Sequence, residues 1–280
     1  MRVFAEERCA LRAEARPEAR LSFRRAGPRP VIEPAFAESP LRLLTPKNHG
    51  SAAWAYTSTL GGGMVDGDAI RLHVDVREGA AAVLASQGQN RIYRSARGCR
   101  SELVADVADG ALLALLPDAT VCFAGASYEQ KTELRLARGA SAVLVDILSC
   151  GRAARGERWA FRRYSGEVSI RLGDRLVAAE RLLLDPAHGP LAERLGRFDA
   201  LCTIVLAGEA VLEDRAAIAR RIEAMPLVPR AARIEQSNDL GGALLLRIAA
   251  ASGEDAMRAV RDYLHFLPEL LGDDPYARRP

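Results

Sequence analysis

Two polar segments in the first third of the chain carry the residue types best suited to chemistry. The first is Leu60–Asp68, with the sequence LGGGMVDGD, a glycine-rich turn that holds two carboxylates. The second follows about twenty residues later, over residues 86–95, with the sequence SQGQNRIYRS. It places amides, a tyrosine and two arginines where a strand is expected to end. The glycines suggest a phosphate or dinucleotide loop, so these two kinds of site are considered first.

The glycine-rich turn fits neither kind of nucleotide site. A Walker loop needs Gly-Lys-Ser/Thr after its glycines, but Met64, Val65 and Asp66 stand there. A Rossmann loop leads into a helix, whereas residues 70–76 alternate apolar and polar side chains as a strand does. Asp66 and Asp68 would also repel a phosphate. The simplest interpretation is a tight turn in which glycine supplies a positive φ.

Five carboxylates are candidates to handle a metal ion weakly, although acidic residues are most often solvated surface charges. They are Asp66, Asp68, Asp146, Glu157 and Glu180. Asp146 differs from the others because it interrupts the apolar run of residues 142–148. A carboxylate in such a run must find a partner, face a cavity or stay protonated. Arg152 or Arg155 could serve as its structural partner.

No tight metal site and no catalytic constellation is predicted. The four histidines are isolated, and the five cysteines include no CxxC pair, so the four ligands of a structural zinc site are not assembled locally. The thiols are expected to be reduced, as in a cytoplasmic protein. The hydrolase motifs G-x-S-x-G and H-E-x-x-H are absent. Paired carboxylates could attack a polysaccharide, but a chain with 5% aromatic residues offers few platforms for sugars.

The composition limits the expected partners. Of the 280 residues, 49% are hydrophobic, which is enough for a sizeable core. The formal net charge is only +3, so nucleic acid is not an expected partner. No apolar run reaches the roughly 18 residues of a membrane span, and the N-terminus lacks the apolar region of a secretory signal. We therefore expect a cytoplasmic protein without membrane contact.

The fold is expected to be mostly β. A strand, a Gly-Ala turn and a second strand recur three times, with turn glycines Gly79, Gly110 and Gly139. This period of about 30 residues favours stacked rungs in a β-helical, solenoid-like scaffold. An ordinary β-meander with similar turns is the alternative. A hairpin is predicted over residues 166–184, around the Gly173-Asp174 turn.

Two or three helices are expected in the C-terminal third. Residues 211–226 and 254–271 carry apolar side chains at helical spacing, and Pro268 would kink or end the second helix early. The remaining assignments are a strand over residues 243–249 and a frayed or short helical segment over residues 1–18. Nothing resembles a flexible linker, so residues 1–280 are predicted to form a single domain.

The chain resembles the UreD family of urease accessory proteins, also called UreH, through five blocks that occur in the same order. The blocks are the glycine-rich segment 60–68, the S-Q-G and R-I-Y-R-S segment 86–95, L-L-P-D-A with F-A-G-A over 115–126, G-R-A-A-R-G-E over 151–157, and E-R at 180–181. Residues 151–157 alone fit either a turn with an Arg–Glu pair or a docking loop. Asp66 and residues 88–90 differ from the residues that are commonest in bacterial members of the family. The motifs therefore do not decide between a bacterial subgroup and a plant and fungal subgroup.

The resemblance implies a protein without catalytic activity that works in urease maturation. It implies binding to urease apoprotein, to UreF and, through UreF, to UreG, and delivery of nickel to urease. The implied fold is a β-helical stack with a few helices. A nickel passage has been proposed for the family. By motif position, Asp68, Asp146, Glu157 and Glu180 are candidates to line it, together with Asp66.

Carboxylates would release Ni²⁺ more readily than thiolates or imidazoles, so transient Ni²⁺ and no tightly bound cofactor is expected. Seven further motif residues are expected to have structural or docking roles: Gly61, Gly62, Gly63, Gln87, Tyr93, Arg94 and Arg152. Two other functions remain open, a β-solenoid enzyme that acts on polysaccharide and a purely structural clamp that never touches nickel. An acidic external groove lined by aromatic residues would indicate the enzyme.

Overall fold

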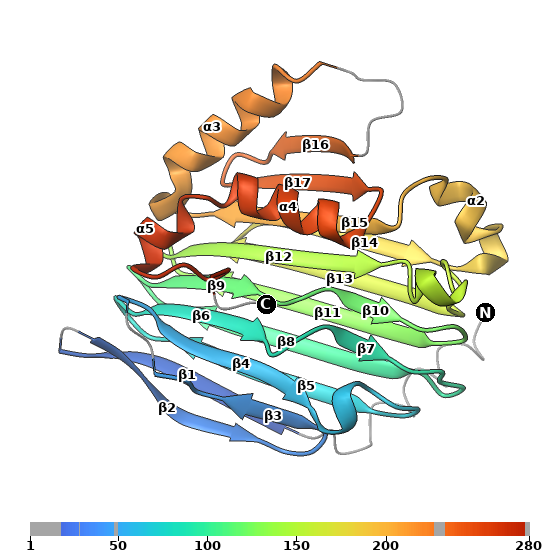
Figure 1. Cartoon of the computed structure of the whole chain (residues 1–280). Helices are drawn as coiled ribbons and strands as arrows, with labels where there is room; N and C mark the ends of the chain where they lie inside the picture. The colour runs from blue at the N-terminus through green and yellow to red at the C-terminus, as the bar shows by residue number, and fades with distance from the viewer. Residues whose placement is uncertain (1–17, 28, 48–49, 227–232, 278–280) are drawn as a thin grey trace.

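The computed structural model describes residues 18–27, 29–47, 50–226 and 233–277, which form two β-sheets packed face to face (Figure 1). The first sheet has the order β14 (Arg175–Leu184), β13 (Arg163–Leu172), β11 (Ser127–Leu136), β8 (Cys99–Val107), β5 (Ala69–Val76), β1 (Glu18–Ala26) and β2 (Arg29–Ala37). The second has the order β16 (Arg233–Asp239), β17 (Ala243–Ala250), β15 (Ala200–Ala207), β12 (Ser141–Ser149), β9 (Leu112–Leu116), β6 (Ala81–Ser86), β4 (Ala53–Thr59) and β3 (Leu41–Leu44). Two short strands, β7 (Asn90–Ile92) and β10 (Thr120–Cys122), pair with each other, and β10 also pairs with β12. The predicted mostly β class is confirmed.

Parallel strands at the centre of both sheets stack with a constant register. In the first sheet Val76 of β5 pairs with Val107 of β8, which pairs in turn with Leu136 of β11. In the second sheet β6, β9 and β12 pair in the same parallel manner. Each circuit of the chain through both sheets therefore lies on the previous circuit. This arrangement confirms the predicted stacked rungs and excludes the β-meander.

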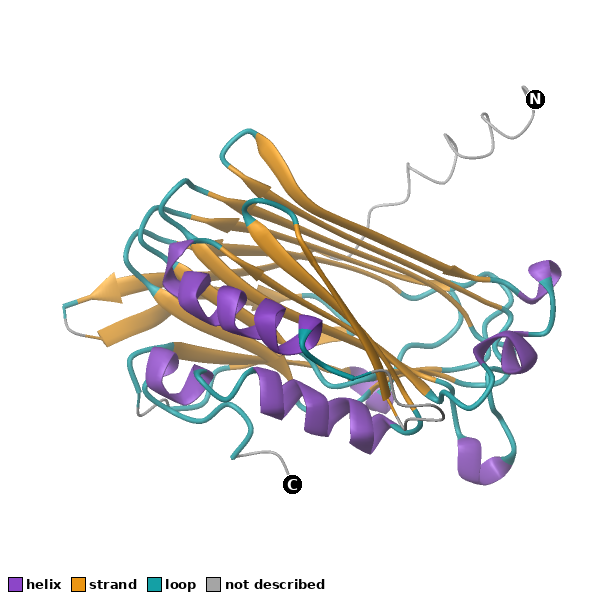
Figure 2. Ribbon diagram, turned by 90° about the horizontal axis from the view of Figure 1, so that it is seen from above, coloured by secondary structure: helices purple, strands orange, loops and turns teal. Residues whose placement is uncertain are grey.

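The rungs have a tight end and an open end. At the tight end, called here the turn end, Gly79 and Gly110 adopt φ values of 62° and 63°, a left-handed backbone that glycine enters without strain. The Gly79 N–H donates to the Asp109 carbonyl at 3.2 Å, so neighbouring turns are bonded to each other. The opposite end, called here the loop end, holds residues 60–68, 87–98, 117–126 and 150–162. Figure 2 shows short helical turns gathered at one end of the strands.

The layer between the sheets changes from apolar at the turn end to partly polar nearer the loop end. Alternate residues of a strand face the same side. On β11, Leu134 and Leu136 face the buried apolar core near the turn end. Tyr128, Gln130 and Thr132 occupy the same face nearer the loop end, where they line a cavity. The two sheets are therefore joined by apolar packing at the turn end. Nearer the loop end they enclose a cavity with both polar and apolar lining, beside a further apolar cluster that includes Met64, Ile92 and Trp159.

Helices pack on the outer face of the second sheet, as Figure 2 shows. They are α3 (Leu212–Glu223), α4 (Gly253–Tyr263) and α5 (Leu267–Leu271). The Ser252 hydroxyl caps α4 by accepting a hydrogen bond from the Asp255 N–H at 3.0 Å. Pro268 lies in the first turn of α5, where proline is tolerated. The predicted helix over residues 254–271 is therefore two helices, broken before the proline.

Short helical elements occur in the connections: η1 (Leu60–Gly62), η2 (Ala153–Arg155), η3 (Pro186–His188), α2 (Leu191–Leu195) and η4 (Glu209–Val211). The hairpin predicted around Gly173 is formed by β13 and β14, and β17 contains the strand predicted over residues 243–249. The segment predicted to be frayed or helical lies outside the described residues except for Glu18, which begins β1. Among the described helices, none is long and apolar enough to cross a membrane.

Candidate functional site

The two polar segments singled out in the sequence lie side by side at the loop end. The Met64 N–H donates to the Arg91 carbonyl at 2.8 Å, and the Tyr93 N–H donates to the Met64 carbonyl at 3.0 Å. A Cβ atom on Gly63 would lie 2.5 Å from the Arg91 carbonyl oxygen, so only glycine fits this close approach. The glycine-rich turn therefore packs directly against the backbone of the second segment.

Asp66 and Asp68 fix the shape of this turn. The Asp68 carboxylate accepts a hydrogen bond from the Val65 N–H at 2.8 Å. The Asp66 carboxylate accepts from the backbone N–H of Arg97 at 2.7 Å and from its Nε at 3.3 Å. Desolvation raises the pKa of Asp66, but the hydrogen bonds and charge of Arg97 outweigh it and hold the pKa below its usual range. Neither carboxylate lines the cavity.

Tyr93, Phe123 and Arg152 form a stacked cluster on the neighbouring loops. The Tyr93 and Phe123 rings meet edge to face with centroids 5.2 Å apart, and the Arg152 guanidinium lies 4.2 Å from the Phe123 centroid. Arg152 Nε donates to Glu157 at 2.9 Å, and this contact lowers the pKa of Glu157. Residues 151–157 therefore contain the Arg–Glu pair that the sequence suggested. The Arg94 side chain packs over Gly125 in the same region.

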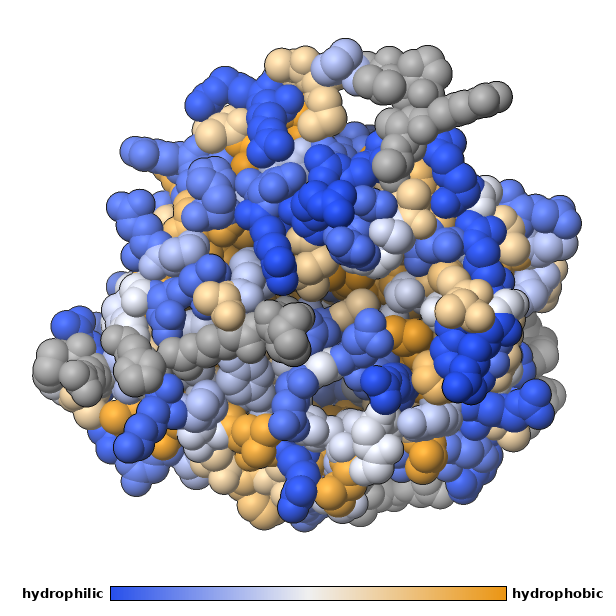
Figure 3. Space-filling model, viewed as in Figure 1, coloured by the Kyte–Doolittle hydropathy of each residue, from blue (hydrophilic) through white to orange (hydrophobic). Residues whose placement is uncertain are grey.

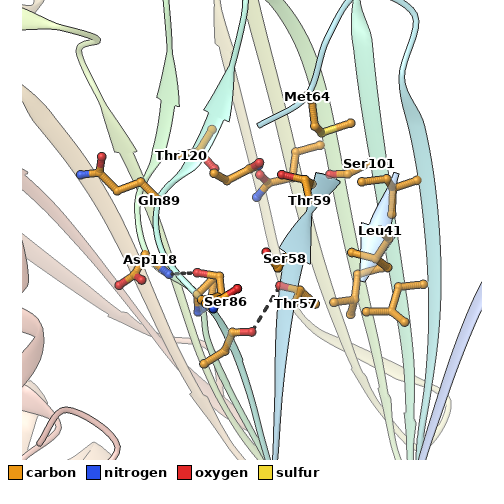
Figure 4. Close-up of a pocket in the computed structure, with 18 of the residues that line it drawn as sticks. Leu41, Thr57, Ser58, Thr59, Met64, Ser86, Gln89, Ser101, Asp118 and Thr120 are labelled. Atoms are coloured by element: carbon orange, nitrogen blue, oxygen red, sulfur yellow. Dashed lines mark hydrogen bonds between the residues drawn. The ribbon is translucent and has the colours of Figure 1, made fainter. Parts of the chain in front are cut away.

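A cavity of about 390 Å³ lies between the sheets and reaches the surface at the loop end. Its polar side chains come from both sheets and from the connecting loops, and Thr57, Thr59, Ser86 and Ser101 are among those labelled in Figure 4. Gln87 and Asn90 also line the cavity. The Ser86 hydroxyl accepts a hydrogen bond from the Asp118 N–H at 2.7 Å, which holds the rim of the cavity. Gln87 is exposed at this rim, and Gly62 also contributes to the lining.

Asp146 of β12 faces this cavity. Its Oδ1 atom accepts a hydrogen bond from Gln130 Nε2 of β11 at 3.1 Å, which joins the two sheets. Within the described part of the chain, no cationic side chain lies within ion-pair distance of it. Burial raises the pKa of Asp146, while the Gln130 hydrogen bond opposes the rise. The proposed Arg152 partner was wrong because Glu157 takes that guanidinium, and Arg155 is exposed in η2.

Glu180 of β14 is held in an ion pair with Arg247 of β17, with Nε to Oε2 at 3.0 Å. Arg247 pairs in register with Thr203, which pairs with Asp146, so the three side chains follow one row across the second sheet. Glu180 reaches this row from the first sheet, but it does not line the cavity. Of the five predicted carboxylates, the structure places only Asp146 in the cavity wall and puts Glu180 in the adjoining layer.

Gln130 and Tyr128 of β11 were not predicted as site residues, and Asn90 was noted only as part of the polar segment 86–95. Asn90 Nδ2 donates to the Tyr128 hydroxyl at 3.3 Å, and that hydroxyl also bonds Ser101 at 2.5 Å. A signal for them exists, since Tyr128, Gln130 and Thr132 are polar at the alternate positions that become apolar at Leu134. When the inward-facing side chains of one strand change from apolar to polar, the polar part is expected to line a cavity.

The described residues contain no group of three or more His, Cys, Asp or Glu side chains that could hold a metal ion. The cysteines of the described part, Cys99, Cys122, Cys150 and Cys202, are unpaired in disulfides and buried. Burial raises the pKa of the Cys150 thiol to about 11, so it stays protonated at neutral pH. Thus the cavity wall offers hydroxyl, amide and carboxylate oxygens, and its carboxylates are Glu102, Asp118 and Asp146.

Comparison with known proteins adds a family relationship. The family model described as UreD urease accessory protein matches residues 15–280. A urease accessory protein UreD from Sorangium cellulosum is 48% identical over 266 residues, covering 92% of this chain and 83% of the relative. One from Anaeromyxobacter is 38% identical, with 98% and 96% covered. A urease accessory protein D from rice is 29% identical, with 97% and 99% covered.

Proposed function

The chain belongs to the UreD family of urease accessory proteins, and from this premise we propose that it is a scaffold that delivers nickel to urease. It binds urease apoprotein and UreF, and reaches UreG through UreF. Its role is urease maturation rather than catalysis, so the polysaccharide-active alternative receives no support. The cytoplasm is the compartment in which we expect this assembly.

The observation that carries the nickel part of the proposal is the cavity between the sheets, whose wall includes the Asp146 carboxylate. Ni²⁺ prefers nitrogen and sulfur ligands when it is held tightly, so hydroxyl, amide and carboxylate oxygens hold it weakly enough to release it. The Asp146 carboxyl has no cation beside it and is held by one amide. An entering divalent cation would therefore supply the missing positive charge and favour the ionised carboxylate.

The deciding experiment is nickel loading of urease apoprotein with purified UreF, UreG and this protein. Asp146→Asn removes the charge and keeps the shape of the side chain. We expect lower nickel content and lower urease activity, with an unchanged amount of assembled complex on gel filtration. Asp66→Asn is the matched control, because that carboxylate lies in the turn and not in the cavity.

A structural clamp that never touches nickel is the remaining alternative. It predicts equal nickel loading with the wild type and with the double variant Asp146→Asn, Glu180→Gln. Equal loading by that double variant would reject the nickel passage while leaving the role in urease maturation intact. Failure of the wild-type protein to associate with either UreF or urease apoprotein would reject the maturation role itself.

A further inference from the structure

Three loops at the loop end are bonded into one continuous surface beside the cavity. The Phe123 N–H donates to the Ile92 carbonyl at 2.9 Å, and the Gly125 N–H donates to the Ala160 carbonyl at 3.0 Å. The Arg162 guanidinium spans the outer loops by donating to the Ala96 carbonyl at 3.1 Å. These bonds tie segments 91–96, 123–126 and 160–162 together. The surface they form is therefore prepared before any partner arrives.

Arginines are concentrated on this surface. Arg97 and Arg152 are matched by the carboxylates of Asp66 and Glu157. Four others, Arg91, Arg94, Arg155 and Arg162, are exposed and have no carboxylate within 4.0 Å among the described residues. Figure 3 shows strongly hydrophilic side chains at the right-hand end of this face of the molecule, and also over its top and centre. The chain as a whole is nearly balanced, with 39 basic and 36 acidic residues, so this local excess is not a general property of the surface.

The same surface contains the two side-chain types that dominate protein interfaces. Tyr93 lies half-buried against Phe123, and Arg152 is stacked on that ring. Aromatic and arginine side chains that are already held in place lose little conformational entropy when a partner binds. Arg91 belongs both to this surface and to the cavity wall, so a partner bound here would lie at the cavity rim.

We propose that Arg91, Arg94, Arg155 and Arg162, called here the arginine surface, form the docking site for an acidic surface of urease apoprotein, the partner that the family description names. This inference rests on the proposed function, because it places urease apoprotein at the rim of the cavity. A nucleic acid is disfavoured by the nearly balanced total charge and by the short extent of the arginine surface. Guanidinium groups pair with carboxylates in a bidentate geometry that lysine cannot match.

The test uses the full-length protein with all four arginines replaced by glutamine. Its control replaces Arg25, Arg77, Arg138 and Arg171, which are exposed near the turn end and carry the same total charge. The affinities of the wild type and both variants for urease apoprotein and for the UreF–UreG complex are measured at two salt concentrations. Circular dichroism and thermal melting verify that each variant is folded.

We expect the arginine-surface variant to bind urease apoprotein about tenfold more weakly and with a smaller salt dependence, while the control binds like the wild type. Equal affinity of the wild type and the arginine-surface variant for urease apoprotein would overturn the docking inference alone, even if the variant bound the UreF–UreG complex more weakly. Equal weakening by the control would also overturn it, since total charge would then explain the effect. Arginine-dependent binding to duplex DNA without such binding to either protein would identify a different partner class. Lack of binding by the wild type would instead count against the proposed function.

Discussion

Asp146 combines two properties that rarely occur together, a position within an apolar strand and a carboxyl without a cation. Its neighbours Val145 and Ile147 are almost fully buried, yet its own side chain faces the cavity between the sheets. Tyr128, Tyr164 and Cys202 lie near it and have raised pKa values of their own, so the groups around it do not supply positive charge. Burial therefore raises the pKa of Asp146, and a cation bound beside it would lower that pKa again.

The raised pKa of Asp146 makes the folding stability of the protein change with pH in a defined direction. Because the folded state binds the Asp146 proton more tightly than the unfolded state, this group lowers stability as pH rises above about 3.9 and toward its folded pKa. Asp146→Asn lacks the ionisation, so it should be more stable than wild type at neutral pH, by on the order of 1 kcal/mol. The gain should shrink near pH 4. Urea denaturation of both proteins at several pH values measures it, and a gain that is constant with pH would contradict the assignment.

Gly63 supports a second prediction for a single residue. Its missing side chain allows the glycine-rich turn to meet the Arg91 backbone and the Tyr93 ring. Gly63→Ala should therefore destabilise the protein by roughly 1–3 kcal/mol, since the clash is with backbone that cannot move freely. Gly88→Ala is the control, because no heavy atom lies within 4 Å of a Cβ placed there. Thermal melting of both variants tests this prediction. Similar losses of stability would show that the close backbone approach at Gly63 does not cause the destabilisation.

At the scale of elements, the repeated strands were predictable and the polar layer was not. Gly79, Gly110 and Gly139 mark turns that the sequence shows directly, and their spacing of about 30 residues agrees with the register of β5, β8 and β11. The pairing of Gln130 with Asp146 depends on which strand faces which across the sheets, and no local pattern gives that information. For the same reason the sequence suggested Arg152 for Asp146, since closeness along the chain was the only available guide.

The loop carboxylates illustrate the same limit. Asp66 and Glu157 stand in the family's motifs, but their partners are an arginine thirty-one residues away and one five residues away. Both contacts shape loops, and neither carboxylate lines the cavity. A motif identifies positions that matter for the fold or for the site, while only the three-dimensional contacts separate these two roles.

The Glu180–Arg247 pair is the element-scale feature that is easiest to test. It joins β14 at the edge of the first sheet to β17 of the second, and it sits beside the polar layer. Arg247→Gln or Glu180→Gln alone leaves a partly buried charge unpaired and should cost about 1–2 kcal/mol. The double variant should recover part of that loss. A double-mutant cycle measured by urea denaturation gives the coupling, and strictly additive losses would show that the pair does not link the sheets.

On the scale of the whole molecule, the main apolar core and the family motif residues lie at opposite ends of the strands. The turn end holds the apolar core that joins the sheets, while the loop end carries the motif residues, the cavity rim and the arginine surface. If nickel enters the cavity as proposed, its brief binding would depend on the oxygen ligands of the cavity wall, since the described residues contain no closed metal site.

Blocking the cavity tests the proposed passage of nickel directly. Thr59 lies at the end of β4, faces the cavity and makes no side-chain hydrogen bond within the described structure. Thr59→Trp should fill the space near the rim, whereas Thr59→Val changes polarity with little change in volume. If nickel passes through this space, the tryptophan variant lowers nickel loading of urease apoprotein several-fold while association with UreF and with the apoprotein stays at the wild-type level. The valine variant should load nearly as well as wild type. Normal loading by a folded tryptophan variant would mean that nickel takes another route, and the cavity would then need a different explanation.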